Sequence, residues 1–474
     1  MTLLAKYYVP GLCIEDHSIE VPLDWSAPDE SERLSLFYRV VCAPENESRD
    51  MPLLVFLQGG PGGPGPRPLS PDSDGWIAEA VRHFRVILPD QRGTGRSSRV
   101  QASVARRFGT PRALADYLHH FLADSIIRDF EHLRRTEFGG RRWVTLGQSY
   151  GGFLTLTYLS TFPEAILASF TAGGIPAIDA GPDTVYEHTV RKMMMKTRRY
   201  YERYPGDAAR VAAVADALRD GDVHLPNGDP LTVRRLQMLG GGMGMKPAPE
   251  RLHWLFDQAF ADGDGSVASG VGVGVAGEDG ASSAASASSA SRRPTLTDGF
   301  LMNVLSETES YNRPLYWTLQ EFIYLNGGAE GQCAPADWAA DRQIARHAEM
   351  APDARPLCFI GEAALPDMFA TDSSLRPFRD AEELMMHDTR WGMIYDLDRL
   401  ASNEVPLQAA VYHDDMYVPS ELSLASLEHI GASHAWVTNE FEHDGIHGDS
   451  VFPRLYNEAL DRGDLRAVFA DRYC

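Results

Sequence analysis

The sequence predicts an α/β fold, with a mostly parallel central sheet flanked by helices and interrupted by a mainly helical insertion. Short apolar runs alternate with amphipathic segments in the first part of the chain, which is typical of a parallel sheet covered by helices on both faces. Helical patterns then dominate the middle of the chain, and strand patterns return after Val405. We therefore expect a sheet domain formed by residues 1–177 and 391–474, with residues 178–390 inserted as a second domain.

The elements follow in chain order. Apolar runs bounded by glycine and proline predict strands at Ser35–Ala43, Leu53–Leu57, Phe84–Leu88 and Trp143–Leu146. Apolar residues at helical spacing predict helices at Asp124–Arg135, Thr189–Arg203 and Asp207–Leu218. Two late strands are predicted at Leu407–Tyr412 and His434–Thr438, with a helix between them at Pro419–Ile430. The late strands complete the sheet that the insertion interrupts.

Residues 262–293, inside the insertion, are almost wholly Gly, Ser, Ala and Val. This composition offers few large side chains to bury, so it predicts a flexible surface loop. The loop contains a Gly-Val-Gly-Val-Gly run, but no predicted strand or lysine accompanies it, which argues against a phosphate-binding loop.

The composition excludes several classes of protein. The 474 residues carry 44 Lys+Arg against 66 Asp+Glu, a net charge of −22, which argues against a nucleic-acid partner. The N-terminus has no signal-peptide pattern, and no apolar run is long enough for a membrane span, so no membrane partner and a cytoplasmic location are expected. The 5 cysteines are far apart and form no CxxC pair, which predicts neither a disulfide framework nor a metal site.

The segment Gly147-Gln-Ser149-Tyr-Gly151 has the G-x-S-x-G pattern of a nucleophilic serine. It follows a predicted strand and precedes the apolar run Phe153–Leu159, which is the strand–turn–helix context that such a serine needs. The bare pattern is weak in a chain with 42 glycines, and the alternative is that Ser149 is an ordinary turn residue. The context favours Ser149 as a nucleophile.

A nucleophilic serine needs a base and a group that orients it, and in this kind of fold they follow in the order Ser, acid, His. Asp415 follows the late strand Leu407–Tyr412, and His443 follows the last strand. Asp414 is an alternative acid, although only one of two neighbours on an extended chain can point at the histidine. His447 is an alternative base, and we favour His443.

Acyl transfer also needs donors for the oxyanion that forms on the substrate. The backbone N–H of Tyr150, directly after the serine, is one candidate. The loop of residues 58–66, rich in Gly and Pro, follows the strand Leu53–Leu57, and Gly60 is its candidate donor. The alternative is a plain surface loop.

Four motifs together resemble the proline iminopeptidases (prolyl aminopeptidases), and most closely the larger bacterial members. They are Gln58-Gly-Gly-Pro-Gly62, Asp90-Gln-Arg-Gly-Thr-Gly-Arg-Ser97, Gly147-Gln-Ser-Tyr-Gly-Gly152 and Asp415-Met-Tyr-Val-Pro419. The resemblance implies an α/β-hydrolase fold with a helical cap, a serine peptidase triad of Ser149, Asp415 and His443, and no cofactor or metal. It also implies short peptides with an N-terminal proline as substrates. The family loop usually begins with His where this chain has Gln58.

The resemblance further implies that cap carboxylates hold the cationic imino group of the substrate. Glu321, in Glu321-Phe-Ile-Tyr, resembles the family's cap glutamate and is our first candidate anchor, and Glu362 is the second. Glu307 and Glu309 are weaker candidates. For each of these residues the alternative is a solvated helix face.

The expected reaction releases N-terminal proline through a prolyl-enzyme intermediate on Ser149. A second hypothesis keeps the site and changes the substrate, giving an esterase or amidase for small uncharged acyl compounds. A third is a binding protein on a hydrolase scaffold, against which the complete triad argues.

Overall fold

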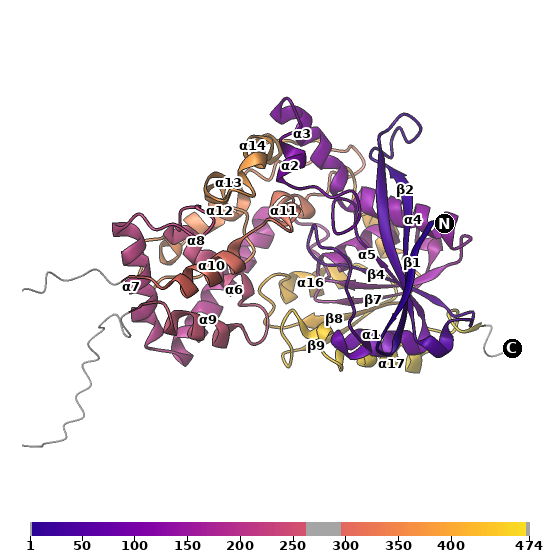
Figure 1. Cartoon of the computed structure of the whole chain (residues 1–474). Helices are drawn as coiled ribbons and strands as arrows, with labels where there is room; N and C mark the ends of the chain where they lie inside the picture. The colour runs from indigo at the N-terminus through magenta and orange to yellow at the C-terminus, as the bar shows by residue number, and fades with distance from the viewer. Residues whose placement is uncertain (1, 262–294, 471–474) are drawn as a thin grey trace, which may run out of the picture.

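The computed structural model describes residues 2–261 and 295–470 (Figure 1). Within these residues nine strands form one sheet in the order β1-β2-β3-β5-β4-β6-β7-β8-β9. They are β1 (Thr2–Val9), β2 (Leu12–Pro22), β3 (Arg33–Cys42), β4 (Leu53–Leu57), β5 (Arg85–Pro89), β6 (Trp143–Gln148), β7 (Ile166–Ala172), β8 (Leu407–Tyr412) and β9 (Ser433–Thr438). The six strands predicted from the sequence are all present, and β1, β2 and β7 are additional.

The sheet is parallel from β5 to β9, whereas β1, β2 and β3 pair antiparallel at one side. Leu57 of β4 pairs with Gly147 of β6, and Gln148 pairs with Ala172 of β7. Ala172 in turn pairs with Ala410 of β8. Because parallel strands end at the same edge, the segments that follow β4, β6, β7 and β8 meet there.

Helices cover both faces of this sheet. Phe56 of β4 stacks on Trp76 in the cluster under one face, while its neighbour Val55 belongs with Leu154 to the cluster under the other. The first face is covered by α1 (Gly75–His83) and α17 (Val451–Arg462), and the second by α4 (Ala123–Glu137), α5 (Tyr150–Thr161) and α16 (Ser420–Leu427). Three shorter helices, α2 (Ala102–Ala105), α3 (Pro111–Leu118) and α15 (Leu397–Ala401), complete this part. The alternation of buried faces along β4 is that of a strand buried on both sides.

Between β7 and β8, every element that the structure assigns among the described residues is a helix. Besides α15 and several short 3-10 helices, they are α6 (Pro182–Arg203), α7 (Asp207–Asp220), α8 (Val233–Gln237), α9 (Ala248–Asp257), α10 (Asp298–Thr308), α11 (Pro314–Thr318), α12 (Ala339–Ala345), α13 (Pro366–Thr371) and α14 (Arg379–Met386). Of the limits of the predicted insertion, 178 falls between β7 and α6 and 390 falls between α14 and α15, and the division itself stays a prediction. The predicted loop of residues 262–293 lies outside the described residues.

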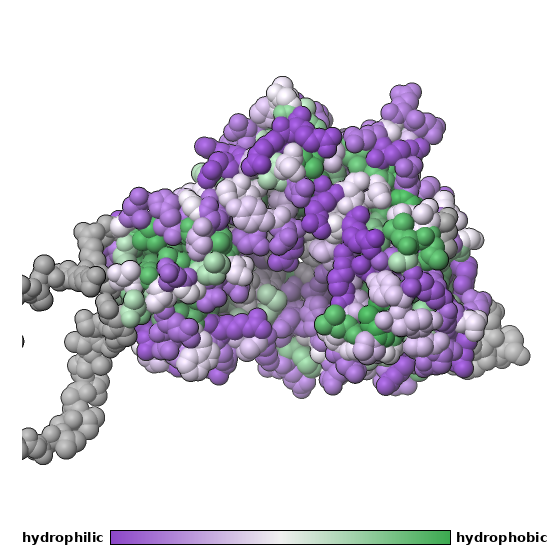
Figure 2. Space-filling model, viewed as in Figure 1, coloured by the Kyte–Doolittle hydropathy of each residue, from purple (hydrophilic) through white to green (hydrophobic). Residues whose placement is uncertain are grey.

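The insertion lies beside the carboxyl edge of the sheet, and the surface is hollowed between the two parts (Figures 1 and 2). One continuous buried cluster nevertheless runs from Val55 in the sheet to Met193 and Phe359 in the insertion. The two parts therefore share a core. Among the described helices, none has the length and apolarity that crossing a bilayer requires.

The segment Asp90–Ser97, which follows β5, connects neighbouring parts of the sheet domain through buried hydrogen bonds. Arg92 is fully buried, and its Nε donates to Asp129 Oδ2 of α4 at 2.7 Å. Asp90 accepts hydrogen bonds from the backbone N–H groups of Gly65, at 3.0 Å, and of Arg96, at 2.8 Å. The bond from Gly65 joins the segment after β5 to the loop after β4, which the sequence predicts to stabilise an oxyanion.

Candidate active site

Ser149 occupies a sharp turn between β6 and α5. Its φ of 55° and ψ of −124° lie in a region that non-glycine residues rarely adopt. The surrounding glycines are required by close packing: a Cβ on Gly151 would lie 1.8 Å from the carbonyl oxygen of Leu57, and one on Gly147 would lie 2.3 Å from that of Gly151. The geometry is that of a nucleophile elbow.

His443 and Asp415 form a buried hydrogen-bonded pair. The distance from His443 Nδ1 to Asp415 Oδ2 is 2.7 Å. The second oxygen of Asp415 accepts from the backbone N–H groups of Tyr417, at 2.8 Å, and Val418, at 3.0 Å. Because Asp415 is fixed in this way and binds Nδ1, it orients the histidine ring and leaves Nε2 for proton transfer.

The charges around His443 favour its protonated form. Burial lowers the pKa of His443, but the carboxylate of Asp415 and the nearby charge of Glu362 outweigh it, so the pKa lies above its ordinary value. A histidine with this environment can hold the proton that a serine gives up during attack.

Gly173 and Gly174, which follow β7, connect the serine and the histidine. A Cβ on Gly173 would lie 3.1 Å from His443 Nδ1, and one on Gly174 would lie 2.5 Å from the carbonyl oxygen of Ser149. Two consecutive residues therefore touch the histidine ring and the serine backbone. Ser149, Asp415 and His443 are brought to one place by the ends of β6, β8 and β9.

The alternative residues face elsewhere. Asp414 accepts from Arg199 Nη1 at 2.7 Å and lies 3.0 Å from His413 Nδ1. His447 is half exposed and pairs with Asp74 at 2.9 Å, beside α1. Neither contact involves the pair of His443 and Asp415, so the geometry favours the predicted residues over both alternatives.

The loop after β4 passes close to the serine. A Cβ on Gly59 would lie 3.1 Å from Ser149 Cβ, and Gly60 directly follows. Tyr150 is the first residue of α5, so its N–H belongs to the first turn of the helix, where the N–H groups have no partner within the helix. Gly60 and Tyr150 remain the candidate oxyanion donors.

Glu362 lies near the catalytic pair. The hydroxyl of Tyr316 donates to Glu362 Oε1, and Gln320 Nε2 lies 3.4 Å from Oε2. Burial raises the pKa of Glu362, while the hydrogen bond from Tyr316 and the charge of His443 oppose that rise. Tyr316 itself packs on the loop after β4, since a Cβ on Gly62 would lie 2.9 Å from the Tyr316 nitrogen. Glu362 is the predicted carboxylate that the structure brings to the site.

Glu321, the first candidate from the sequence, is placed elsewhere. Its two carboxylate oxygens accept from the backbone N–H groups of Ala339 and Ala340, each at 2.9 Å, at the start of α12. It is fully buried, and burial raises its pKa to about 8 against those two hydrogen bonds. With both oxygens occupied by a helix terminus, Glu321 caps α12 and does not line the cavity that holds Glu362. The structure thus gives no support to the expectation that Glu321 is the amine anchor.

A cavity in the insertion is lined by Glu362 and Tyr316, and also by the exposed residues Glu307 and Arg313. The two weaker candidates, Glu307 and Glu309, lie along it. Ser149 and His443 do not line this cavity, but Glu362 does, and the charge of Glu362 interacts with His443. The cavity therefore adjoins the candidate site at Glu362 and does not include the serine or the histidine.

Known proteins resemble this chain over almost its whole length. The family model described as alpha/beta hydrolase fold matches residues 52–215. A proline iminopeptidase from Aeromonas sobria is 36% identical over 452 residues, which cover 95% of this chain and 97% of the relative. The chain belongs to the proline iminopeptidase family. A proline iminopeptidase named aneH, from Aspergillus aculeatus, is 29% identical over 465 residues, or 96% of either chain.

This membership confirms the resemblance and the α/β-hydrolase fold predicted from the sequence. Other members of the proline iminopeptidase family match less of the chain: one from Neisseria gonorrhoeae is 32% identical over 113 residues, 24% of this chain and 29% of that relative.

Three features of the site were not predicted. Tyr316 and Gln320 contact Glu362, and the pair Gly173-Gly174 lies between the serine and the histidine. A double glycine after an apolar run is a visible signal of a strand end, whereas nothing in the sequence links Tyr316 to Glu362.

Proposed function

We propose that this protein is a prolyl aminopeptidase, a serine peptidase that releases N-terminal proline from short peptides. The observation that carries the proposal is the buried pair of His443 and Asp415 beside the strained Ser149, with the carboxylate of Glu362 within charge range of His443. The names of the two relatives that match over almost the whole chain support the same substrate class. In this proposal residues 178–390 form the cap that supplies Glu362.

The reaction begins with attack of Ser149 Oγ on the carbonyl carbon of the N-terminal proline. His443 Nε2 takes the serine proton, since its Nδ1 is held by Asp415. The N–H groups of Gly60 and Tyr150 stabilise the oxyanion, a contribution of roughly 3–4 kcal/mol per donor.

The scissile C–N bond then breaks as His443 gives its proton to the leaving amine, which leaves a prolyl ester on Ser149. Water attacks this ester with His443 again acting as the base. Proline is released, and the serine regains its proton. This sequence of steps needs no cofactor or metal.

Glu362 would restrict the reaction to free N-terminal residues. A carboxylate pairs with the cationic imino nitrogen through a charge-assisted hydrogen bond, which fixes the orientation of the substrate. Because the anchored nitrogen and the attacked carbonyl belong to the same residue, a fixed distance between Glu362 and Ser149 admits one residue between them. Blocking the nitrogen removes its charge and this anchor.

The proposal includes the cytoplasm as the place of action, on the ground that the cysteines among the described residues are free.

The proposal is tested by comparing Pro-p-nitroanilide, acetyl-Pro-p-nitroanilide and p-nitrophenyl acetate as substrates of the wild-type enzyme. We expect efficient turnover of Pro-p-nitroanilide, which has a free amine, and poor turnover of the other two compounds. The variant Ser149→Ala should have a kcat for Pro-p-nitroanilide that is lower by roughly 10⁴- to 10⁶-fold, with an unchanged circular dichroism spectrum. Equal turnover of the free and acetylated anilides, or of the ester alone, would establish the esterase hypothesis instead.

A further inference from the structure

A turn of the insertion, residues 240–244, lies against the loops of the candidate active site. The backbone N–H of His443 donates to the carbonyl oxygen of Gly244 at 3.0 Å. The N–H of Gly244 donates in turn to the hydroxyl of Tyr417 at 3.0 Å, and that hydroxyl donates to the carbonyl oxygen of Gly241 at 2.6 Å. One residue of the insertion is therefore bonded both to the histidine of the site and to a tyrosine.

Tyr417 contacts the pair of His443 and Asp415 in two ways. Its backbone N–H donates to Asp415 Oδ1 at 2.8 Å. Its ring stands edge-on to the imidazole of His443, with the ring centroids 4.8 Å apart and an angle of 72° between the planes. Both side chains are buried, so the two rings fix each other by close packing. Tyr417 thus touches the acid, the histidine and the turn of the insertion.

Gly244 is required at this contact. A Cβ at this position would lie 2.3 Å from Cε2 and 2.5 Å from Cζ of the Tyr417 ring. These atoms belong to a ring packed on His443, so they cannot move aside without disturbing the histidine. The absence of a side chain at Gly244 lets the backbone of the turn approach the tyrosine closely enough for both hydrogen bonds of the hydroxyl.

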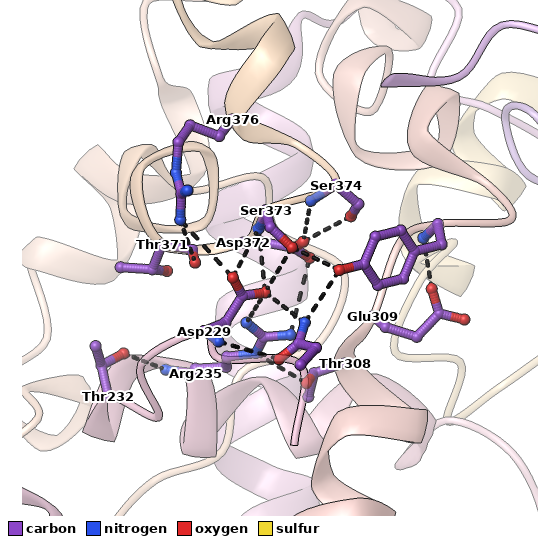
Figure 3. Close-up of polar contacts among 12 residues, drawn as sticks. Asp229, Thr232, Arg235, Thr308, Glu309, Thr371, Asp372, Ser373, Ser374 and Arg376 are labelled. Carbon is purple, nitrogen blue, oxygen red and sulfur yellow. Dashed lines mark hydrogen bonds and ion pairs between the residues drawn. The ribbon is translucent and has the colours of Figure 1, made fainter. Parts of the chain in front are cut away.

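The turn is anchored in the insertion by buried polar contacts. It lies at the end of the 3-10 helix Met238–Gly242, which directly follows α8. In α8, Arg235 Nε donates to Thr308 Oγ1 of α10 at 3.0 Å, and Arg235 Nη1 lies 3.4 Å from Asp229 Oδ2 (Figure 3). The backbone N–H of Arg235 donates to Thr232 Oγ1 at 3.0 Å, at the start of the helix. The turn therefore extends from a helix that its neighbours hold in place.

The same turn contacts the segment that carries Glu362. A Cβ on Gly240 would lie 2.6 Å from the carbonyl oxygen of Ile360. The N–H of Ile360 donates to the carbonyl oxygen of Gln237, directly before the 3-10 helix, at 2.8 Å. The turn thus lies between the proposed anchor of the substrate and the proposed base. Different residues, Gly240 and Gly244, make its contacts to the two.

We propose that Tyr417 and the turn of residues 240–244 position His443 for proton transfer from Ser149, with the hydroxyl of Tyr417 as the link between the turn and the histidine. The inference deepens the proposed function and rests on it, because it needs Ser149 as the nucleophile and His443 as the base. Tyr417 and Gly244 are positioning residues, since they act through His443. The insertion then has a second task besides binding the substrate: it holds the base beside the serine.

The test compares the wild type with Tyr417→Phe, which keeps the ring on His443 and removes both hydrogen bonds of the hydroxyl. Two quantities are measured: kcat for Pro-p-nitroanilide, and the second-order rate constant for inactivation of Ser149 by a small uncharged fluorophosphonate. Both reactions need His443 to take the serine proton, whereas only the first needs the substrate anchor.

We expect both quantities to fall by about 10- to 100-fold in Tyr417→Phe, because small displacements of a catalytic group have effects of this size. The KM for Pro-p-nitroanilide should stay the same, since the contact of Gly240 with the Glu362 segment remains. The acidic limb of the pH profile should also stay in place, because no charge near His443 changes. A loss of overall stability alone would not produce this combination.

Gly244→Ala tests the turn itself. The added Cβ forces the turn and the Tyr417 ring apart, so both quantities should fall by at least the same factor. Because the two substitutions disturb one link, the loss in the double variant should be smaller than the product of the two single losses.

Tyr158→Phe is the matched control. Tyr158 is a buried tyrosine of α5 whose hydroxyl donates to Glu131 Oε2 at 2.9 Å. A hydrogen bond to a charged group contributes more to stability than one to a carbonyl, so this variant should lower the melting temperature at least as much as Tyr417→Phe. Its kcat and its inactivation rate should remain those of the wild type.

Several results would overturn the inference. Unchanged rates in Tyr417→Phe would show that the hydroxyl does not position the histidine, and a raised KM with an unchanged inactivation rate would show that Tyr417 acts on the substrate instead. Equal losses in Tyr158→Phe, or losses that multiply in the double variant, would contradict it as well. A wild type that reacts with the fluorophosphonate but does not cleave the anilide would overturn the proposed function alone, since the inactivation rates still compare His443 in the two proteins.

Discussion

At the scale of single residues, the environment of Glu362 bears on two parts of the proposed function, the choice of substrate and the pH range. Glu362 contacts Tyr316 and Gln320, and its charge is one of the influences that raise the pKa of His443. Two carboxylates, Asp415 and Glu362, thus act on one histidine. Asp415 is hydrogen-bonded to the ring, whereas Glu362 acts on it through charge.

Glu362→Gln should therefore have two separable effects. The acidic limb of the pH profile of kcat/KM should move to lower pH, because His443 must be neutral to act as the base and loses a charge that raises its pKa. The KM for Pro-p-nitroanilide should rise at least tenfold, since the imino nitrogen loses its charged partner. Steady-state kinetics across pH 5–9 measure both effects.

Glu321→Gln serves as the comparison for Glu362→Gln. Glu321 caps α12, so its substitution should lower the melting temperature and leave the acidic limb and the KM in place. A loss of free-amine selectivity in Glu321→Gln, with Glu362→Gln unaffected, would reverse our assignment of the anchor.

At the scale of elements, helix α6 links the insertion to both catalytic loops. Lys196 Nζ donates to Glu442 Oε2 at 2.6 Å, next to His443, and Arg199 Nη1 donates to Asp414 Oδ2 at 2.7 Å, next to Asp415. Lys196 is only 7% exposed, so its ion pair is shielded from solvent. One helix of the insertion therefore positions the residues that flank the histidine and the acid.

Lys196→Met should lower kcat by about 10- to 100-fold with little change in KM, because small displacements of a catalytic group have effects of this size. Burial already raises the pKa of Glu442, and loss of its partner leaves that carboxylate without compensation. Lys196→Arg keeps the positive charge and should retain most of the wild-type kcat. If Lys196 acted only by filling space, the arginine variant would not be expected to perform better than the methionine variant.

Arg191→Met is the matched control for Lys196→Met. Arg191 lies on the same helix and pairs with Glu187 of that helix at an exposed position. The variant Arg191→Met should keep the wild-type kcat. Equal losses in the two methionine variants would show that α6 tolerates no such change, and would remove the positioning role of Lys196.

At the scale of the whole molecule, the sequence predicted what local pattern determines. The strands β4, β5, β6 and β8 are continuous apolar runs, and the order of Ser149, Asp415 and His443 follows from the succession of strand ends. β2 was not predicted because its buried residues include Asp16 and His17, polar residues that an apolar strand pattern does not contain. Asp16 lies 3.2 Å from Arg39, on the neighbouring strand.

The role of Glu321 shows why the rest of the site could not be predicted. A family-like segment around a glutamate gives no information about which backbone N–H groups it meets, and Ala339 and Ala340 lie far along the chain. The same holds for the contact of Tyr316 with Glu362, which joins α11 to the segment before α13. Contacts between distant segments of an irregular helical insertion depend on packing that no local pattern records.

The insertion also makes the stability of the whole molecule sensitive to pH. Glu382 of α14 is fully buried, and neither of its carboxylate oxygens has a hydrogen-bond partner among the described residues. Burial raises its pKa well above the ordinary value, and the charge of Glu321, whose own pKa is about 8, raises it further. Because the insertion and the sheet share one buried cluster, a change here affects the unfolding of both parts.

The free energy of unfolding should therefore fall as the pH rises. A carboxyl group with a raised pKa in the folded state contributes fully below its unfolded pKa, roughly 4.3 for glutamate, and loses that contribution as the pH rises through the folded value. For Glu321 this interval ends at about pH 8. Each such group lowers the free energy of unfolding by up to about 1.4 kcal/mol per pH unit within its interval.

Glu382→Gln should flatten this decline, because a neutral amide replaces a group whose ionisation in the core is unfavourable. Thermal or urea unfolding of the wild type and the variant between pH 5 and pH 9 measures the difference, which should be largest at the alkaline end. Glu383→Gln is the control, since its carboxylate is exposed and contacts Trp338 at 3.0 Å. If both variants follow the wild-type curve with pH, the unpartnered carboxyl of Glu382 does not govern the alkaline stability of the molecule.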